Sequence, residues 1–304
     1  MAFLSARVGR IIPSASSVAT QRARELAAAG RDVLSLSQGE PDFATPGHVI
    51  EAAHRAMLAG QTRYTTIDGI PELKAAVVEK FRRENALEFK PENVSVGAGG
   101  KQVLFNAVMA TMDPGDEAVI PAPFWLAYRD MVQFAEGNAR YVQTLPANGF
   151  KITPAELEAA LTPRAKWLLL NSPGNPAGST YSAAELAALA AVLDRHPQVW
   201  VLSDDIYEHV IFDGRAFATM AKVAPQLAGR KDQAQGIARA ILDRPGAAGF
   251  RKLGCPPPGG RRGLTGLGRG WYKTNTCLFY TRDAQTRTGA PRAPLGQPAA
   301  ADPR

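Results

Sequence analysis

The sequence has only two cysteines, Cys255 and Cys277, among 304 residues. Two thiols are too few for a disulfide framework, and neither has a metal-ligand partner at a useful spacing. A disulfide framework and a cysteine-based metal site are therefore both excluded. The chain also lacks the run of about 18 apolar residues that a membrane-spanning helix needs. Residues 1–12 contain arginines but no long apolar core and no small-residue cleavage pattern, which argues against a secretory signal. We therefore expect a cytoplasmic protein without a membrane partner.

Acidic residues are scarce only in the last quarter of the chain. Of the 35 Lys and Arg and the 28 Asp and Glu, residues 231–304 hold 13 and 4, a net charge of +9. Residues 1–230 hold the other 22 and 24, a net charge of −2. The basic segment also contains 12 Gly and 8 Pro among 74 residues, a composition typical of weakly folding chain. The overall charge of +7 therefore says nothing about partners of the main body.

Helical and strand patterns alternate between residues 14 and 205. The predicted strands are 117–120, 140–144, 166–170 and 199–202. The predicted helices are 48–59, which should begin after Thr45 as its cap, 71–84, 103–112, and two that follow capping signatures at Thr153 and Ser182. Strands separated by helices imply right-handed crossovers and a largely parallel sheet. In the basic segment we expect only a short helix at 237–242 and a strand at 273–280.

Polar and glycine-rich motifs follow the predicted strands. The segment at 171–178 reads Asn-Ser-Pro-Gly-Asn-Pro-Ala-Gly, and the segment at 203–207 reads Ser-Asp-Asp-Ile-Tyr. The segment at 97–101, Gly-Ala-Gly-Gly-Lys, joins a strand to a helix, where free N–H groups and the positive helix end suit a phosphate. Each motif alone has an ordinary structural explanation as a turn. Ligands of parallel sheets bind at the strand ends, however, which favours a binding site here.

In combination these motifs resemble the class I/II aminotransferases, and most closely their bacterial aspartate aminotransferase branch. Further matching segments are 37–43, 63–73 and 121–125, and the resemblance runs from about residue 4 to 229. It implies an α/β protein of the pyridoxal-phosphate-dependent transferase fold type I, with a mainly parallel, doubly wound large domain that is truncated and ends in an irregular C-terminal tail. Residues 1–45 would form an N-terminal arm and part of the small domain, 46–229 the incomplete cofactor-binding large domain, and 230–304 a Gly/Pro/Arg-rich tail, disordered or out of frame.

The resemblance implies pyridoxal 5′-phosphate as the cofactor, since transamination needs an electron sink next to the substrate's α-carbon. Asp204 matches the buried carboxylate that keeps the ring nitrogen protonated, and the adjacent Asp205 should face the other way. Asn175 and Tyr207 match the groups that hydrogen-bond the ring's phenolic oxygen. Trp125 matches the aromatic side chain that stacks on the ring. Asp204 and Tyr207 are therefore the expected catalytic residues, and Trp125 and Asn175 should also contact substrate.

The remaining expected contacts concern the phosphate and the substrate carboxylate. By the same resemblance Gly99, Gly100 and Lys101 bind the phosphate, although Lys101 could instead contact substrate. Gly39 matches the site where a backbone amide meets the substrate's α-carboxylate. Tyr64 matches a tyrosine that reaches the phosphate of a neighbouring subunit, so the resemblance implies a homodimer with shared sites.

The resemblance fails where the lysine that forms the Schiff base belongs. Family members carry a Ser-Lys pair some way after the aspartate, with one arginine shortly beyond and another far toward the C-terminus. Here the interval at 227–236 reads Leu-Ala-Gly-Arg-Lys-Asp-Gln-Ala-Gln-Gly, without a Ser-Lys pair. Lys231 is the nearest candidate in number but has a polar, strandless context, and Lys222 looks like an exposed helix residue. The Gly, Pro, Arg and Ala of residues 243–304 suggest a frameshifted or truncated gene.

Three functions fit the sequence. The first is transfer of an amino group between an aspartate-like amino acid and a 2-oxo acid, in a chain left inactive by the missing lysine. The second is another fold type I activity, a lyase or a synthase, because these enzymes share Asn175, Asp204 and Tyr207. The third is a non-catalytic remnant whose basic tail binds nucleic acid through arginines near aromatic residues. A solvated tail explains the same composition, so we do not expect nucleic-acid binding.

Overall fold

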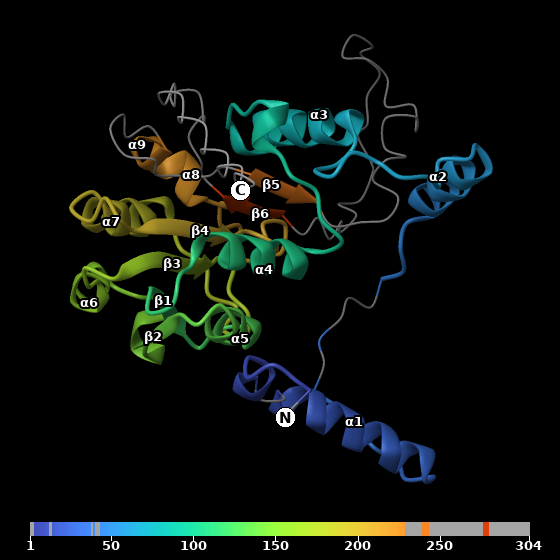
Figure 1. Ribbon diagram of the computed structural model, residues 1–304, viewed down its shortest axis with the longest axis horizontal. Coiled ribbons are helices and arrows are strands. Elements are labelled where there is room, and N and C mark those ends of the chain that lie inside the picture. Colours follow the sequence, from blue (N-terminus) through green and yellow to red (C-terminus); the bar gives the residue numbers. More distant parts are fainter. Residues whose placement is uncertain are drawn as a thin grey trace, which may run out of the picture.

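The computed structural model describes residues 3–11, 14–37, 39, 43–228, 239–242 and 276–279 (Figure 1). Its helices are α1 (Ala15–Ala28), α2 (Gly47–Leu58), α3 (Pro71–Lys80), α4 (Gly100–Thr111), α5 (Ala127–Phe134), α6 (Pro154–Ala160), α7 (Ala183–Leu193), α8 (Met220–Val223) and α9 (Pro225–Ala228). Its strands are β1 (Glu117–Ala122), β2 (Asn138–Gln143), β3 (Ala165–Asn171), β4 (Trp200–Asp204), β5 (Arg239–Leu242) and β6 (Thr276–Phe279). Single turns are η1 (Val8–Arg10), η2 (Phe81–Asn85), η3 (Pro91–Asn93) and η4 (Pro146–Asn148). None of the helices in these ranges is long and apolar enough to cross a membrane.

The strands form one sheet in the order β2-β1-β3-β4-β6-β5. The first four are parallel to one another, as the alternation of strands and helices predicts. β6 is antiparallel to β4 and to β5. In the β3–β4 register the last residues, Asn171 and Asp204, are partners. The segments after these two strands therefore leave the sheet side by side at its carboxyl edge.

The strands β1, β3 and β4 are mostly buried because they alternate apolar side chains between two helix layers. On β3, Trp167 and Leu169 pack with residues of α4 and α5, whereas Leu168 and Leu170 pack with residues of α6, α7 and α8. All four side chains are almost fully buried. At about 1.5–3 kcal/mol for each large apolar side chain removed from water, these two layers provide most of the stability. A smaller cluster joins α3 to the segment around Val94.

Helix starts follow the predicted caps in two cases of three. Thr153 accepts a hydrogen bond from the N–H of Glu156 at 3.3 Å, and the Glu156 carboxylate accepts one from the N–H of Thr153 at 2.7 Å. Ser182 and Glu185 repeat this capping box at the start of α7. The predicted cap at Thr45 is wrong. α2 begins at Gly47 after Pro46, whose extended backbone (ψ 138°) sets the start one residue later and leaves no side-chain cap.

In the basic segment the predicted helix at 237–242 is wrong, and the predicted strand at 273–280 contains β6. Residues 239–242 form β5 instead, paired antiparallel with β6. A helix of six residues has little stability of its own, whereas a strand beside another strand satisfies its backbone groups. A local pattern cannot reveal a partner more than thirty residues away along the chain. The rest of the tail lies outside the described residues.

The N-terminal elements lie apart from the sheet. Figure 1 shows α1 below it and α2 to one side. Within the described chain α1 buries no side chain. Large apolar side chains of this region, including Leu34, Leu36 and Met57, are exposed. The α4–α8 layers and the parallel strands therefore form the body that positions the site.

The packing of the loop before α3 against the body can be tested by a substitution at Gly69. Its φ is +104°, and a Cβ atom there would lie 2.6 Å from Cγ2 of Val96. We expect Gly69→Ala to lower the free energy of unfolding by about 2–4 kcal/mol, because backbone strain and overpacking each cost roughly 1–3 kcal/mol. Urea denaturation measures the change. Gly60→Ala is the matched control, since Gly60 has φ +74° but no atom within 4 Å of that position. An equal loss in both variants would contradict the packing argument.

Candidate functional site

The centre of the candidate site is the carboxylate of Asp204 at the end of β4. This residue is buried, with 4% of its surface exposed. The hydroxyl of Tyr128 on α5 donates to Oδ2 at 2.5 Å, and the N–H of Ile206 donates to Oδ1 at 3.3 Å. A buried carboxylate needs such donors, because its desolvation is costly without them. Asp204 therefore lies among hydrogen-bond donors at the carboxyl edge of the sheet.

Sequence reasoning missed Tyr128. Its ring meets that of Trp125 edge to face, with 5.4 Å between the centroids. Trp125 lies just before α5 and Tyr128 in its first turn, three positions apart, a spacing that brings side chains together at a helix start. That spacing was the available signal, but only the sheet shows that Asp204 lies on the same side. Tyr128 therefore links the predicted stacking residue to the predicted carboxylate.

Asn175 and Tyr207 lie within hydrogen-bond reach of each other. Nδ2 of Asn175 donates to the hydroxyl of Tyr207 at 3.3 Å. The link between them and the sheet is Asn171, which donates from Nδ2 to the carbonyl of Asp204 at 2.8 Å and accepts the N–H of Asn175 at 2.8 Å. Burial raises the pKa of Tyr207, with the hydrogen bond from Asn175 acting against it. The phenol therefore stays protonated and can donate a hydrogen bond.

The glycine turn at 97–101 forms the N-terminus of α4, beside Trp125. Gly99 is the N-cap residue, with φ +116°, and the next N–H groups belong to the first turn, which has no intrahelical acceptors. Nζ of Lys101 lies 5.2 Å from the centroid of the Trp125 ring, a cation–π contact. Gly97 has no room for a side chain, because a Cβ atom there would lie 2.5 Å from Cγ2 of Val103. The turn is thus held close to the body.

These contacts form one continuous path through the predicted cofactor residues. It runs through seven residues, with links through the main-chain carbonyl of Asp204 and the main-chain N–H of Asn175: Lys101, Trp125, Tyr128, Asp204, Asn171, Asn175 and Tyr207. The donor set fits pyridoxal 5′-phosphate: a helix N-terminus and a lysine for a phosphate, an indole for an aromatic ring, a buried carboxylate for a ring N–H, and an amide with a phenol for an anionic oxygen. The residues present therefore suit the group that the resemblance implies.

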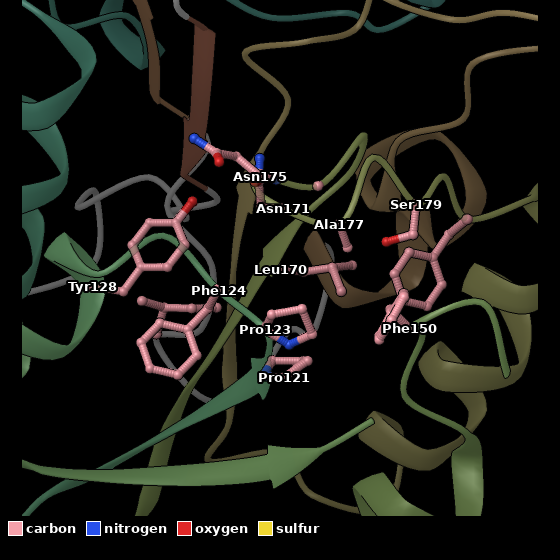
Figure 2. Close-up of a pocket in the computed structure, with 13 residues that line it drawn as sticks. Pro121, Pro123, Phe124, Tyr128, Phe150, Leu170, Asn171, Asn175, Ala177 and Ser179 are labelled. Carbon is pink, nitrogen blue, oxygen red and sulfur yellow. Dashed lines mark hydrogen bonds between the residues drawn. The ribbon is translucent and has the colours of Figure 1, made fainter. Parts of the chain in front are cut away.

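A pocket lies beside this path, between the segments that follow β1 and β3 (Figure 2). Its cavity volume is about 30 Å³, room for only a few water molecules. In Figure 2 Tyr128, Asn171 and Asn175 lie at one end, and Phe150 and Ser179 at the other. Its walls combine polar groups with the apolar side chains of Pro121, Pro123, Phe124 and Leu170. The two asparagines and Tyr128 therefore belong both to the path and to an opening of the surface.

Three predicted residues, and Lys222, lie apart from the path or outside the described chain. Tyr64 is fully exposed, and no contact with the path is found for it within the described residues. Gly39 is exposed, with no atom within 4 Å of where a side chain would begin. Lys222 is exposed on α8, as expected. Lys231 lies outside the described residues, so its position stays a prediction.

Asp205 points away from Asp204, as the alternation of a strand predicts. Its carboxylate accepts from the hydroxyls of Ser203 and Thr219, both at 2.7 Å. Burial raises the pKa of Asp205 to about 7, and these two hydrogen bonds act in the opposite direction. Two adjacent acids thus occupy different environments. The sequence distinguished their faces but not this second buried network.

The raised pKa of Asp205 predicts a pH dependence of stability. The unfolded carboxyl ionises near pH 3.8 and the folded one only near 7, so rising pH favours the unfolded chain between these values. We expect the unfolding free energy of Asp205→Asn, relative to the natural chain, to increase over this window by up to about 1.4 kcal/mol per pH unit. Denaturation curves at pH 4, 5.5, 7 and 8 measure it. A difference that does not change with pH would refute this prediction.

The hydrogen bond from Tyr128 to Asp204 has a measurable energy. We expect Tyr128→Phe to lower the free energy of unfolding by about 1.5–3 kcal/mol, since hydrogen bonds to charged groups contribute that much. Tyr141→Phe is the control, because the Tyr141 ring stacks on Phe124 while its side chain is about half exposed. The control should change stability by less than about 0.5 kcal/mol. Equal losses in the two variants would show that the buried hydrogen bond contributes no more to the free energy of unfolding than the half-exposed hydroxyl of Tyr141.

Comparison with known proteins gives the family. A family model described as aminotransferase class I and II matches residues 31–240. The aspartate/prephenate aminotransferase of Cereibacter sphaeroides is 55% identical over 240 residues, which cover 79% of this chain and 60% of that protein. The chain thus spans about 60% of the length of this curated relative.

Solved structures agree. The crystal structure of the aspartate aminotransferase from Rhizobium meliloti matches with a TM-score of 0.74 and 44% identity, over 80% of this chain and 59% of that one. The aspartate aminotransferase from Thermus thermophilus with maleate matches with a TM-score of 0.73 and 38% identity, over 92% and 65%. This chain therefore belongs to the class I and II aminotransferases, in their aspartate aminotransferase branch, and has their fold type I architecture.

Proposed function

We propose that this chain binds pyridoxal 5′-phosphate at the carboxyl edge of its sheet, and that its site serves amino-group transfer between an aspartate-like amino acid and a 2-oxo acid. The observation that carries the proposal is the continuous path of contacts from Lys101 to Tyr207. The path brings together groups from four separate segments. Their chemistry is complementary to a phosphate, a pyridinium nitrogen and a phenolic oxygen.

Each residue has a role in this proposal. Gly99, Gly100 and Lys101 hold the phosphate, and Trp125 covers the ring. Tyr64 reaches the phosphate of a second subunit, and Gly39 meets the substrate's carboxylate; both are exposed in the single chain, as a contact to another molecule requires.

The electronic roles belong to the polar residues of the path. When bound, the cofactor withdraws electrons from the substrate's α-carbon. Asp204 keeps the ring nitrogen protonated, and Tyr128 holds its carboxylate in place. Asn175 and Tyr207 donate to the phenolic oxygen. These groups hold the cofactor and orient it, but they do not supply the amine that tethers it.

We propose further that this chain does not complete amino transfer. Its sequence contains no Ser-Lys pair. Among the described lysines, Lys101 contacts Trp125 and Lys222 is exposed on α8. Loss of the amine removes both the tether and the group that moves the α-proton, and general acid–base catalysis alone contributes about 10²–10⁴ in rate. The cofactor would therefore bind without a covalent bond.

The names of the relatives favour transamination over the lyase or synthase alternative. The Cereibacter sphaeroides protein is called an aspartate/prephenate aminotransferase, which makes aspartate the candidate donor and prephenate a candidate 2-oxo acid. We also propose a cytoplasmic homodimer with an N-terminal arm at 1–45, a cofactor-binding domain at 46–229 and a tail at 230–304. The family match ends at residue 240, close to the change of composition, which supports this last boundary.

Cofactor titration tests the proposal. We expect pyridoxal 5′-phosphate to quench the fluorescence of Trp125 saturably, and pyridoxal without the phosphate to bind more weakly because it cannot use the helix N-terminus. Asp204→Asn should weaken binding by roughly 10–150-fold, the equivalent of a charge-assisted hydrogen bond. Borohydride treatment should leave no cofactor attached to the chain.

Two results would contradict the proposal. Absence of saturable binding would refute the cofactor site itself. A borohydride-stable adduct mapped to Lys231, with keto-acid formation from aspartate and 2-oxoglutarate, would refute the claim that this chain lacks its tether. Trp125→Phe is the control for the signal, because it should abolish the quenching while Trp167 and Trp200 still fluoresce.

A further inference from the structure

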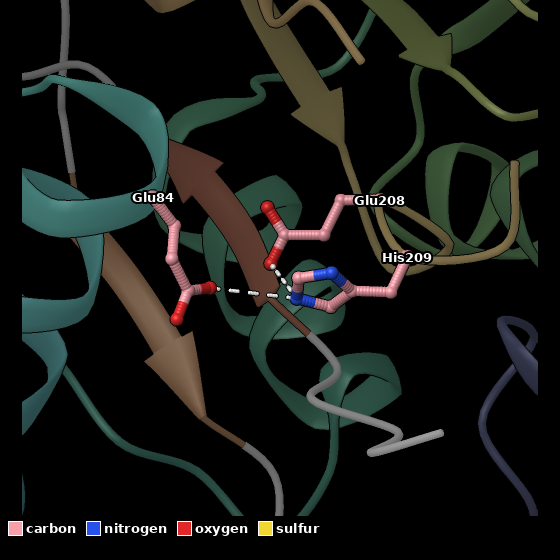
Figure 3. Close-up of side chains that lie close together, drawn as sticks. All are labelled: Glu84, Glu208 and His209. Atoms are coloured by element: carbon pink, nitrogen blue, oxygen red, sulfur yellow. Dashed lines mark ion pairs between the residues drawn. The ribbon is translucent and has the colours of Figure 1, made fainter. Parts of the chain in front are cut away.

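A second polar cluster lies directly after Tyr207 and involves residues far away in the sequence (Figure 3). Glu208 is buried, with 6% of its surface exposed. Its Oε1 forms an ion pair with Lys80 of α3, and its Oε2 accepts from Nδ2 of Asn85 at 3.0 Å. Lys80 also donates to Oδ1 of Asn85 at 2.9 Å. We call Lys80, Glu84, Asn85, Glu208 and His209 the clamp, because it joins the end of α3 and η2 to the turn that follows β4.

Glu84, Glu208 and His209 could in principle hold a metal ion, but the clamp already contains its cations. Nζ of Lys80 pairs with Glu208 and lies 3.7 Å from Oε2 of Glu84. Nε2 of His209 lies 3.3 Å from Glu208 and 3.5 Å from Glu84. These contacts, first of all the one with Glu208, raise the pKa of His209 to about 9. A protonated imidazole donates hydrogen bonds and cannot bind a metal ion, so the clamp is an ion network.

The charges of the clamp stabilise one another around neutral pH. Burial opposes ionisation of Glu208, but the hydrogen bond from His209 and the charge of Lys80 together hold its pKa below the ordinary value. The hydrogen bond from His209 also lowers the pKa of Glu84 to about 2. Both carboxylates are therefore ionised and paired. Removal of one partner would leave another charge buried without compensation.

The turn held by the clamp carries Tyr207. The N–H of Glu208 donates to the carbonyl of Asp205 at 2.9 Å, and the N–H of Val210 donates to the carbonyl of Tyr207 at 2.7 Å. At one end the turn continues from Asp204 in the sheet, and at the other Glu208 is fixed by α3 and η2. Tyr207 lies between these two fixed points, and its hydroxyl meets Asn175 at 3.3 Å. Movement of Glu208 would therefore move the phenol relative to Asn175.

We propose that Glu208 is a positioning residue for the cofactor site, which acts through Tyr207 by anchoring the turn at 205–210 to Lys80 and Asn85. The proposal rests on the proposed function, since the phenol matters only where a cofactor binds. The side chains of Glu208 and Lys80 pair with each other and with Asn85 rather than with a side chain of the path. Their contribution is to hold one of its members in place.

The chain offers a matched control in Glu117. This carboxylate is as buried as that of Glu208, and it accepts from Thr162 at 2.6 Å and pairs with Arg164 at 3.0 Å. It begins β1, at the edge of the sheet opposite to the end of β4. Glu117→Gln therefore removes a comparable buried charge far from the turn. General destabilisation should appear in both variants, and positioning only in Glu208→Gln.

Hydrogen exchange of the cofactor-free chain tests the anchor. We expect Glu208→Gln and Lys80→Met to speed exchange of the amides of Glu208 and Val210 by about tenfold or more, with Lys80→Arg close to the natural chain because it keeps the charge. Glu117→Gln should leave these amides unchanged. If Glu208→Gln does not fold, the comparison of Lys80→Met with Lys80→Arg still tests the proposal. Unchanged exchange in Lys80→Met, or equal effects of Glu117→Gln, would overturn the proposal.

Cofactor affinity tests the action through Tyr207. We expect Glu208→Gln to weaken binding of pyridoxal 5′-phosphate by about as much as Tyr207→Phe, and the double variant to bind no more weakly than Tyr207→Phe alone. Additive losses would overturn the action through Tyr207. If the natural chain fails to bind the cofactor while Glu208→Gln still speeds exchange, the proposed function is wrong, but Glu208 still anchors the turn at 205–210. If binding occurs but does not depend on Glu208, this proposal alone fails.

Discussion

The burial of the Asp204 carboxylate is the constraint around which the site is organised. A carboxylate removed from water must be met by donors, and here the main donor is the hydroxyl of Tyr128 at 2.5 Å. That requirement ties the end of β4 to α5 and so to the segment that carries Trp125. The backbone carbonyl of Asp204 ties the same strand end to Asn171 on β3. One acidic residue thus connects three segments that a ligand would need together.

The parallel sheet makes this convergence possible. β1, β3 and β4 run in the same direction, so the segments after each strand emerge at one edge although they are distant in sequence. α4 adds the glycine turn from the same side through the contact of Lys101 with Trp125. The apolar residues of β3 pack against both helix layers and so fix this strand between them. Tyr128 belongs to this core and Trp125 packs against it, so the core sets the positions of these site residues.

Three acidic residues at the end of β4 and just after it occupy three different environments. Asp204 faces Tyr128, Asp205 faces the hydroxyls of Ser203 and Thr219, and Glu208 faces Lys80 and Asn85. Burial raises the pKa of Asp205 to about 7, whereas its partners keep the pKa of Glu208 low. The difference lies in the partners, since hydroxyls compensate a buried charge less well than an ammonium group. This short segment is thus held on both sides of Tyr207.

The sequence by itself determined the family, the parallel strands and two of the capping boxes, and it predicted Asp204, Asn175 and Tyr207 as site residues. These features are encoded locally, in strand-end motifs, apolar runs and helix-start signals that do not depend on distant residues. Only the tertiary structure decided that Tyr128 donates to Asp204 and that Lys80 meets Glu208, 128 residues away. It also made a strand of residues 239–242, because the partner β6 lies far along the chain. Side-chain partners and strand pairing depend on how separate segments pack, and periodicity within one segment carries no record of that.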